Sequence, residues 1–333
     1  MPSLFVRVES EMMTRRHFIA KTSVVGGALT MALKTSAQVV TEISCPPLII
    51  DTHTHFYDPT RKQGVPWPTP AEKELYRPVF PEDYKNLPQP CKITGTVVVE
   101  ASSWLDDNEW ILDLAAKDPF IVGFVGNISL AEPSFEKVLE RFSKNKVFRG
   151  IRLSGSALKE ALQNGEKMDR LKRLSELDLS LDVLANVPDL ESVAKISEKI
   201  PGLRMVVDHV ANVKIDGKTP PTPWIAGMKT LNQCPNVYAK LSGLVEGAGK
   251  RDGTTPDKIA FYRPILDYVW ENFGQKRIIY GSNWPVSSLF APCDSVLILA
   301  LKYSELHGPE AMNDIFAGNA KRCYKWLNRG AAA

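Results

Sequence analysis

Eight short apolar segments alternate with helical patterns along most of this 333-residue chain. Such alternation is typical of a parallel α/β sheet. Eight repeats favour a (β/α)8 (TIM) barrel, distorted and forming a single domain, and a doubly wound sheet is the alternative. No Gly-x-Gly-x-x-Gly follows any of the segments, which disfavours nucleotide binding. The expected strands are Leu48–Thr52, Thr96–Glu100, Ile121–Val125, Phe148–Leu153, Leu181–Leu184, Arg204–Asp208, Val237–Leu241 and Arg277–Tyr280.

The first 37 residues read as an export signal. Thr14–Ile19 (TRRHFI) resembles a twin-arginine motif, an apolar run from Val24 to Leu33 follows, and Thr35–Ala37 offers small residues for cleavage. The run is too short for a stable membrane span. An ordinary N-terminal helix is the alternative. We therefore expect a signal over residues 1–37, a barrel domain over residues 46–328, and a periplasmic protein that uses the twin-arginine export machinery.

The charge balance limits the class of ligand, and the cysteine content limits the number of disulfides. The chain has 41 basic and 38 acidic residues, and without residues 1–37 it has 36 of each. No basic face is implied, so we expect a small-molecule substrate and no nucleic acid. The five cysteines are widely spaced, without a Cys-x-x-Cys pair, and allow at most two disulfides whose pairing the sequence leaves open. A homo-oligomer is also left open.

Two of the five histidines, His53 and His55, lie one residue apart where the first apolar run ends. Side chains two residues apart in a strand project to the same side. Two imidazoles held in this way can grip a metal ion or a substrate. The alternative is a pair of buried histidines that only form hydrogen bonds.

Other polar residues follow the later strands, where a barrel carries its chemistry. Glu100 follows the second strand, Arg152 ends the fourth, Lys240 lies on the seventh, and Asn283-Trp284 follow the eighth. Arg152 and Lys240 are expected to bind the substrate, or instead to form ion pairs that close the barrel. Glu100 is a further substrate ligand or a partner of Arg152. Trp284 is expected to stack on a sugar face, with core packing as its alternative.

His209 extends this pattern to the sixth strand. It shares a face with Met205 and Val207, so we expect it to point inward and Asp208 to point away as an anchor. The proline-rich segment from Phe56 to Pro90 holds eight of the 24 prolines. We expect it to be a lid or wall over the site, and the alternative is a surface segment that packs on the side of the barrel.

Four motifs together resemble the amidohydrolase superfamily: Asp51–His55, Asp208-His209, Tyr280–Val286, and Phe316–Ala320. The resemblance runs from about Leu48 to Leu327. It is strongest to the branch of sugar-lactone hydrolases that includes fuconolactonases and pyrone-dicarboxylate lactonases. It implies a metal-dependent hydrolase that opens a lactone.

The resemblance also assigns roles. His53, His55 and His209 correspond to residues that hold a divalent metal, zinc being expected, or polarise the carbonyl, although members of the branch differ in their need for a metal. Asn283 stands where the family usually has an aspartate that accepts a proton from water. An amide cannot act as a carboxylate base, so Asp51 and Glu100 become the candidate bases.

Three other functions are left open. A decarboxylase or a lactone isomerase of the same superfamily would use the same histidines. A non-catalytic periplasmic ligand-binding protein is the third, because of Asn283.

Overall fold

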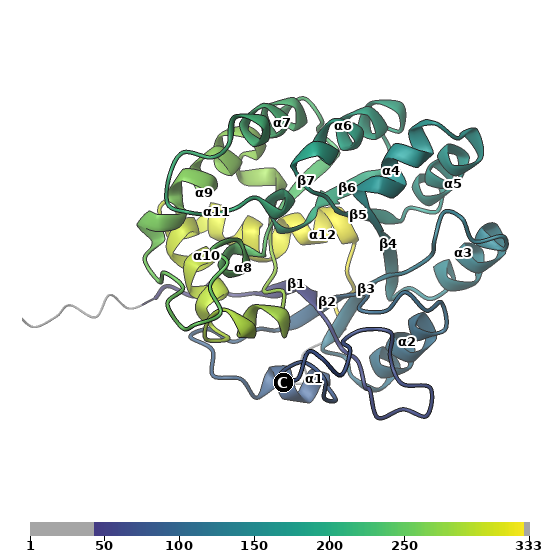
Figure 1. The fold of residues 1–333 in the computed structure, drawn as a ribbon, viewed down its shortest axis with the longest axis horizontal. Helices are drawn as coiled ribbons and strands as arrows, with labels where there is room; N and C mark the ends of the chain where they lie inside the picture. The colour runs from purple at the N-terminus through teal and green to yellow at the C-terminus, as the bar shows by residue number, and fades with distance from the viewer. Residues whose placement is uncertain (1–42, 330–333) are drawn as a thin grey trace, which may run out of the picture. The chain divides into compact units, whose positions relative to one another are not determined.

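Residues 43–329, which the computed structural model describes, contain a parallel eight-stranded barrel surrounded by helices (Figure 1). The strands are hydrogen-bonded in sequence order from β1 to β8. This order confirms the barrel and rules out the doubly wound sheet. The predicted export signal lies outside the described residues. The strands are β1 Ile50–Thr54, β2 Gly95–Val99, β3 Ile121–Gly126, β4 Phe148–Ser154, β5 Ser180–Leu184, β6 Arg204–Val207, β7 Val237–Leu241 and β8 Ile278–Tyr280.

Helices follow most of the strands and cover the outside of the barrel. Their apolar residues recur at helical spacing: α3 buries Phe135, Val138, Leu139 and Phe142 and leaves its polar face outside. The helices are α1 Pro81–Lys85, α2 Asp107–Lys117, α3 Phe135–Ser143, α4 Gly155–Leu162, α5 Gly165–Glu176, α6 Leu190–Lys199, α7 Thr222–Asn232, α8 Leu244–Gly247, α9 Ile259–Phe273, α10 Ser295–Glu305, α11 Pro309–Asn313 and α12 Asn319–Tyr324. Within residues 43–329, no helix has the length and apolar content needed to cross a bilayer.

The strands are buried on both faces, because helices cover one face and the barrel interior covers the other. β2 shows the pattern, since Val97, Val98 and Val99 are all fully buried. The first strand differs from its prediction by two residues: it ends at Thr54, so His53 lies inside the strand and His55 just beyond it. The pairing with β2 extends to Thr54.

The barrel closes where β1 meets the segment after β8. The Asn283 amide donates to the His53 carbonyl at 2.8 Å, and the His55 amide donates to the Trp284 carbonyl at 2.9 Å. Gly281 makes the approach possible, because a Cβ at this position would lie 2.7 Å from the His53 Cβ. The closure therefore places Asn283 beside the two histidines of β1.

A disulfide joins Cys45, before β1, to Cys91, before β2. Cys234, Cys293 and Cys323 are free thiols. The disulfide closes a loop that contains the proline-rich segment, and a cross-link of this kind restricts the unfolded chain more than the folded one.

We expect the double variant Cys45→Ser/Cys91→Ser to lose about 2–4 kcal/mol of unfolding free energy, measured by urea denaturation under oxidising conditions. Cys293→Ser, which removes a free thiol, is the control and should unfold like the wild type. With a reductant present, wild type and double variant should converge. An unchanged midpoint for the double variant in oxidising buffer would show that the cross-link contributes nothing.

Candidate active site

Three histidines converge at the carboxyl ends of the strands. The ring centroids of His53 and His55 are 5.0 Å apart, and those of His53 and His209 are 4.4 Å apart. All three residues are buried, as is Asn283. The structure thus brings together residues from β1, from the end of β6 and from the segment after β8.

His209 reaches the site through an unusual turn. From His209 to Asn212 four consecutive residues have positive φ angles, between 46° and 62°, so strand alternation stops at Val207. For this reason the expectation that Asp208 points away is wrong. Asp208 is also buried, with its Oδ1 3.5 Å from the His53 Nδ1. Gly243, at φ 64°, permits the turn, because a Cβ there would lie 2.6 Å from the His209 Cβ.

A buried charge cluster lies beneath the histidines. The Lys240 ammonium is 2.6 Å from Asp182 Oδ2, 2.9 Å from Asp208 Oδ1 and 3.2 Å from His53 Nδ1. Tyr324 donates a 2.8 Å hydrogen bond to Asp182. Lys240 is fully buried, so its contacts are those of the ion-pair alternative, and substrate binding by this residue stays a prediction.

The cluster shifts the pKa of each member. Burial disfavours the charge on Lys240, but Asp182 and Asp208 outweigh burial and raise its pKa. Burial raises the pKa of Asp182 to about 6, although the Lys240 charge opposes it. Burial acts the same way on Asp208, but Lys240 and His53 hold the pKa of that carboxyl well below its usual range. The cluster therefore carries carboxylate charge that one ammonium only partly balances.

These residues fit a divalent metal ion. One ligand atom each from His53, Asp208 and His209 lies within 4.8 Å of the others. His53 Nε2 is buried and has no hydrogen-bond partner among the described residues. Burial, followed by the Lys240 charge, lowers the pKa of His53 well below its ordinary value, which favours the neutral imidazole that metals require. The partly unbalanced carboxylate charge nearby would also attract a cation.

Each ring nitrogen of His55 faces an oxygen atom, and in the neutral ring only one of the two nitrogens can donate. Its Nδ1 is 3.0 Å from the Val99 carbonyl and its Nε2 is 3.2 Å from Asn283 Oδ1. Burial, followed by the charge of Arg152, lowers the pKa of His55 to about 3. Burial lowers that of His209 to about 4 although Asp208 opposes it. His55 is thus held neutral in a fixed orientation.

Arg152 and Glu100 form an ion pair at the rim. The Arg152 Nε donates to Glu100 Oε1 at 2.8 Å, and its Nη2 donates to the Glu100 carbonyl at 2.8 Å. The pair lines a pocket of about 290 Å³ that also contains Asn127, Ser129 and Ser154. Glu100 is therefore paired with Arg152, which was the alternative to its binding substrate. Arg152 lines the polar pocket, and its charge also reaches His55, whose pKa it lowers.

Two other predicted site residues, Trp284 and Asp51, are held by packing and by hydrogen bonds within the protein. Trp284 is almost fully buried and packs against Phe56 and Tyr84, so its contacts are those of core packing. Asp51 accepts hydrogen bonds from Tyr84 and from the backbone amides of His53 and Ser282. These bonds occupy the Asp51 carboxylate, which makes it a poor candidate for the base.

The proline-rich segment contributes to the wall of the site. The ring of Trp67 lies 6.1 Å from that of His55 and 5.5 Å from that of Tyr57. Tyr57 and Val79 exchange backbone hydrogen bonds that pin the base of the segment. An apolar ring beside a buried imidazole helps to exclude water from the site.

Glu246 is the functional candidate that the sequence reasoning missed. It lies on the four-residue helix α8, and its Oε1 accepts a 2.8 Å hydrogen bond from Asn283 Nδ2. Burial raises the pKa of this carboxyl to about 7. The available signal was its position, five residues beyond the last residue of β7, where a short connection returns to the rim.

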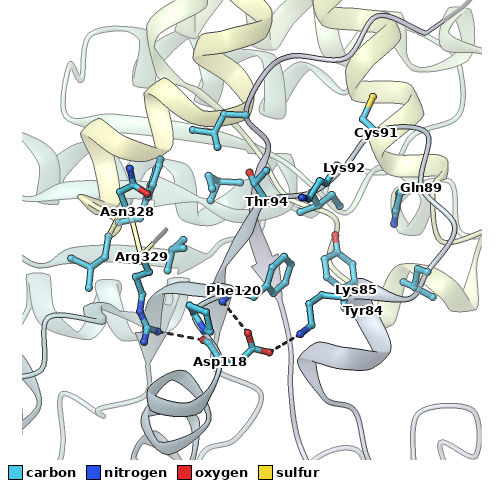
Figure 2. Close-up of a pocket in the computed structure, with 18 residues that line it drawn as sticks. Tyr84, Lys85, Gln89, Cys91, Lys92, Thr94, Asp118, Phe120, Asn328 and Arg329 are labelled. Atoms are coloured by element: carbon cyan, nitrogen blue, oxygen red, sulfur yellow. Dashed lines mark hydrogen bonds and ion pairs between the residues drawn. The ribbon is translucent and has the colours of Figure 1, made fainter. Parts of the chain in front are cut away.

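A larger cavity, of about 780 Å³, lies at the opposite end of the barrel (Figure 2). It is lined by Ile50 of β1, by the segment before β2 that contains Thr94, by Val122 of β3, and by the C-terminal segment with Arg329. Three of its charged groups already have partners: Lys85 pairs with Asp118, and Arg329 donates to backbone carbonyls. Because the strands of a barrel carry their chemistry at the other end, size alone does not make this cavity the active site.

The match to known proteins covers nearly the whole barrel. The amidohydrolase family model matches residues 50–326. A Burkholderia ambifaria protein named L-fucono-1,5-lactonase is 30% identical over 283 residues, which cover 83% of this chain and 95% of that protein. A Burkholderia multivorans protein of the same name is 28% identical over 284 residues, covering 83% and 96%.

Solved structures agree with this family. A Burkholderia multivorans amidohydrolase with bound zinc has a TM-score of 0.72 and 25% identity, covering 84% of this chain and all of that one. A probable 2-pyrone-4,6-dicarboxylic acid hydrolase from Acinetobacter baumannii has a TM-score of 0.64 and 17% identity, covering 84% and 99%. The second likeness supports the fold alone.

The charge cluster generates a stability prediction. Lys240→Met leaves two buried carboxyls without their cation, so we expect a loss of about 3–5 kcal/mol in unfolding free energy, measured by urea denaturation. The loss should be smaller at about pH 5 than at about pH 8, because the variant's folded carboxyls have raised pKa values and take up protons as the pH falls. The exposed Lys92→Met is the control. A loss independent of pH would contradict the electrostatic account.

Proposed function

The chain belongs to the amidohydrolase family and is a hydrolase, and from this premise we propose that it opens a sugar-derived lactone at the rim of the barrel. The observation that carries the proposal is the convergence of His53, His55, His209 and Asn283 in one buried site. The relatives named L-fucono-1,5-lactonase support a cyclic ester as the substrate class.

The pocket beside the site suits such a substrate. Asn127, Ser129 and Ser154 offer amide and hydroxyl groups, which can exchange hydrogen bonds with several sugar hydroxyls. Arg152, held by two hydrogen bonds from its guanidinium to Glu100, presents a fixed positive charge. When water attacks the lactone carbonyl, negative charge develops on the carbonyl oxygen, and a preoriented cation stabilises it.

A divalent metal, zinc by analogy with the Burkholderia multivorans structure, fits the same site. We infer that His53, Asp208 and His209, whose ligand atoms lie within 4.8 Å of one another, would hold it. His55 is the further ligand that the resemblance implies, through its Nε2, because its Nδ1 faces the Val99 carbonyl. When bound, the ion would polarise the carbonyl and make water more acidic. Whatever the metal content, the chain's own residues exclude bulk water, orient the lactone and fix the histidine rings.

The test is turnover of a panel of sugar lactones with the product mass measured. Water addition supports hydrolysis, an unchanged mass indicates isomerisation, and loss of carbon dioxide indicates decarboxylation. Tight lactone binding without turnover would instead support the ligand-binding alternative that Asn283 raised. Each of the last three results would overturn the proposal.

We expect His53→Ala/His55→Ala to lower kcat/KM for the preferred lactone by at least about a hundredfold and to remove any bound divalent metal, measured by elemental analysis. His307→Ala is the control. His307 stacks on Trp270 with their ring centroids 3.6 Å apart, near the end of α10, and its loss should leave turnover unchanged. Full activity in the double variant would contradict the assignment of the active site to these histidines.

We also propose that the protein is exported to the periplasm by the twin-arginine pathway. The Cys45–Cys91 disulfide supports this, because such cross-links persist in oxidising compartments and are rare in the cytosol. The motif that would direct export is centred on Arg15 and Arg16.

We expect Arg15→Lys/Arg16→Lys to leave the protein in the cytoplasm of a bacterium that has this pathway, with Cys45 and Cys91 reduced. The readouts are cell fractionation and thiol labelling. Lys21→Arg keeps both arginines and should be exported normally. Equal periplasmic amounts of the double variant and the wild type would contradict the proposal.

A further inference from the structure

The Asn283 side chain lies between Glu246 and His55. Its Nδ2 donates to Glu246 Oε1 at 2.8 Å, and its Oδ1 lies 3.2 Å from His55 Nε2. The second carboxyl oxygen of Glu246 is buried and has no hydrogen-bond partner among residues 43–329. This row of three polar groups runs from α8 to β1 across the barrel closure.

Hydrogen-bond chemistry limits what this row can do. The Val99 carbonyl can only accept, so His55 Nδ1 must carry a proton and donate to it. In a neutral imidazole the other nitrogen, Nε2, then presents a lone pair to Asn283. An amide has a donor end and an acceptor end, and either end can face this lone pair.

The protonation of Glu246 decides which end it is. An ionised Glu246 only accepts, so it takes the Asn283 Nδ2 and turns Oδ1 toward His55. A protonated Glu246 can donate to Oδ1, which leaves Nδ2 to donate to His55 Nε2. In the first state two acceptors, Oδ1 and Nε2, stand 3.2 Å apart and face the site. In the second state Oδ1 accepts from Glu246 and Nε2 accepts from Asn283 Nδ2, so no acceptor is left.

We propose that Glu246 is a positioning residue that, when ionised, orients the Asn283 amide so that its oxygen serves as the acceptor for the attacking water. Asn283, oriented by Glu246, then supplies the hydrogen-bond acceptor that the family's usual aspartate at position 283 would supply, but not its role as proton acceptor. This inference rests on the proposed hydrolytic function. Asp51 and Glu100 do not fill this role, because their carboxylates already accept hydrogen bonds, Asp51 from the Ser282 amide and Glu100 from Arg152.

The surroundings of Glu246 leave its carboxyl free to change charge near neutrality. Among residues 43–329 no lysine or arginine forms an ion pair with it. His209 lies beside the start of α8, where it contacts Gly243. The titratable neighbour from α9 is Tyr262. The pKa of Tyr262 is raised to a high value by burial and then by the Glu246 charge. Burial raises the pKa of Glu246 to about 7, with the Asn283 hydrogen bond opposing it.

The first test needs no substrate. In protein labelled with nitrogen isotopes in histidine, the NMR signal of His55 Nε2 should shift with a midpoint near pH 7, as Asn283 turns. Glu246→Gln should abolish this titration. Glu136→Gln, an equal change of an exposed carboxyl on α3, should leave it intact. A His55 signal that titrates identically in Glu246→Gln would overturn the inference.

The second test uses the pH dependence of kcat/KM for a lactone. In the wild type the rate should fall below about pH 7, because protonation of Glu246 removes the acceptor. Glu246→Gln should lose this acidic limb. It should retain roughly a tenth to a hundredth of the activity, which is typical when a residue that orients a site residue is replaced. An unchanged acidic limb in Glu246→Gln would contradict the proposal, whereas unchanged behaviour of Glu136→Gln is required by it.

The third test exchanges the two groups. Asn283→Asp alone places two carboxyls in contact, so they should share a proton and move the acidic limb to higher pH. Glu246→Gln/Asn283→Asp puts one carboxylate at position 283 with an amide beside it, and it should recover most of the activity lost in Glu246→Gln. An inactive exchange variant that is folded and binds lactone would overturn the inference. A wild type without any lactone turnover would instead overturn the proposed function, and the NMR titration would still decide the role of Glu246.

Discussion

The site depends on two backbone hydrogen bonds that close the barrel between β1 and the segment after β8. They join Asn283 to His53 and His55 to Trp284, residues that are more than 220 positions apart in the chain. Because both bonds involve residues of the site, the step that completes the barrel also places Asn283 against His55. The absence of a side chain at Gly281 permits this approach, so a residue without chemistry of its own controls the geometry of the site residues.

The charges inside the barrel work in two layers. The lower layer, formed by Lys240, Asp182 and Asp208, is buried and stabilised by its own ion pairs, and it fixes His53 from below. The upper layer, formed by Arg152 and Glu100, faces a polar pocket at the rim. A charge at the rim can meet a substrate, whereas a charge in the interior acts through the histidine that it holds. This division explains why Arg152 on β4 and Lys240 on β7 have different surroundings.

The sequence predicted the barrel well, because strands buried on both faces form continuous apolar runs that are easy to recognise. The expectation that a barrel carries its chemistry at the carboxyl ends of its strands also placed His53, His55 and Asn283 near one another. It failed for Asp208, since the left-handed turn from His209 to Asn212 interrupts strand alternation, and the turn depends on a contact with Gly243 that is distant in sequence. It also missed Glu246, because nothing in a four-residue helix distinguishes a carboxylate at the rim from one in solvent.

The central claim is that the buried histidines at the carboxyl ends of the strands form the site of lactone opening. A crystal structure of the protein with a sugar acid, the product of that reaction, tests it most directly. The account predicts the product's carboxylate within hydrogen-bond distance of Arg152 and beside His53, His55 and His209. A product bound only in the larger cavity at the opposite end of the barrel, with the histidine site untouched, would contradict the account.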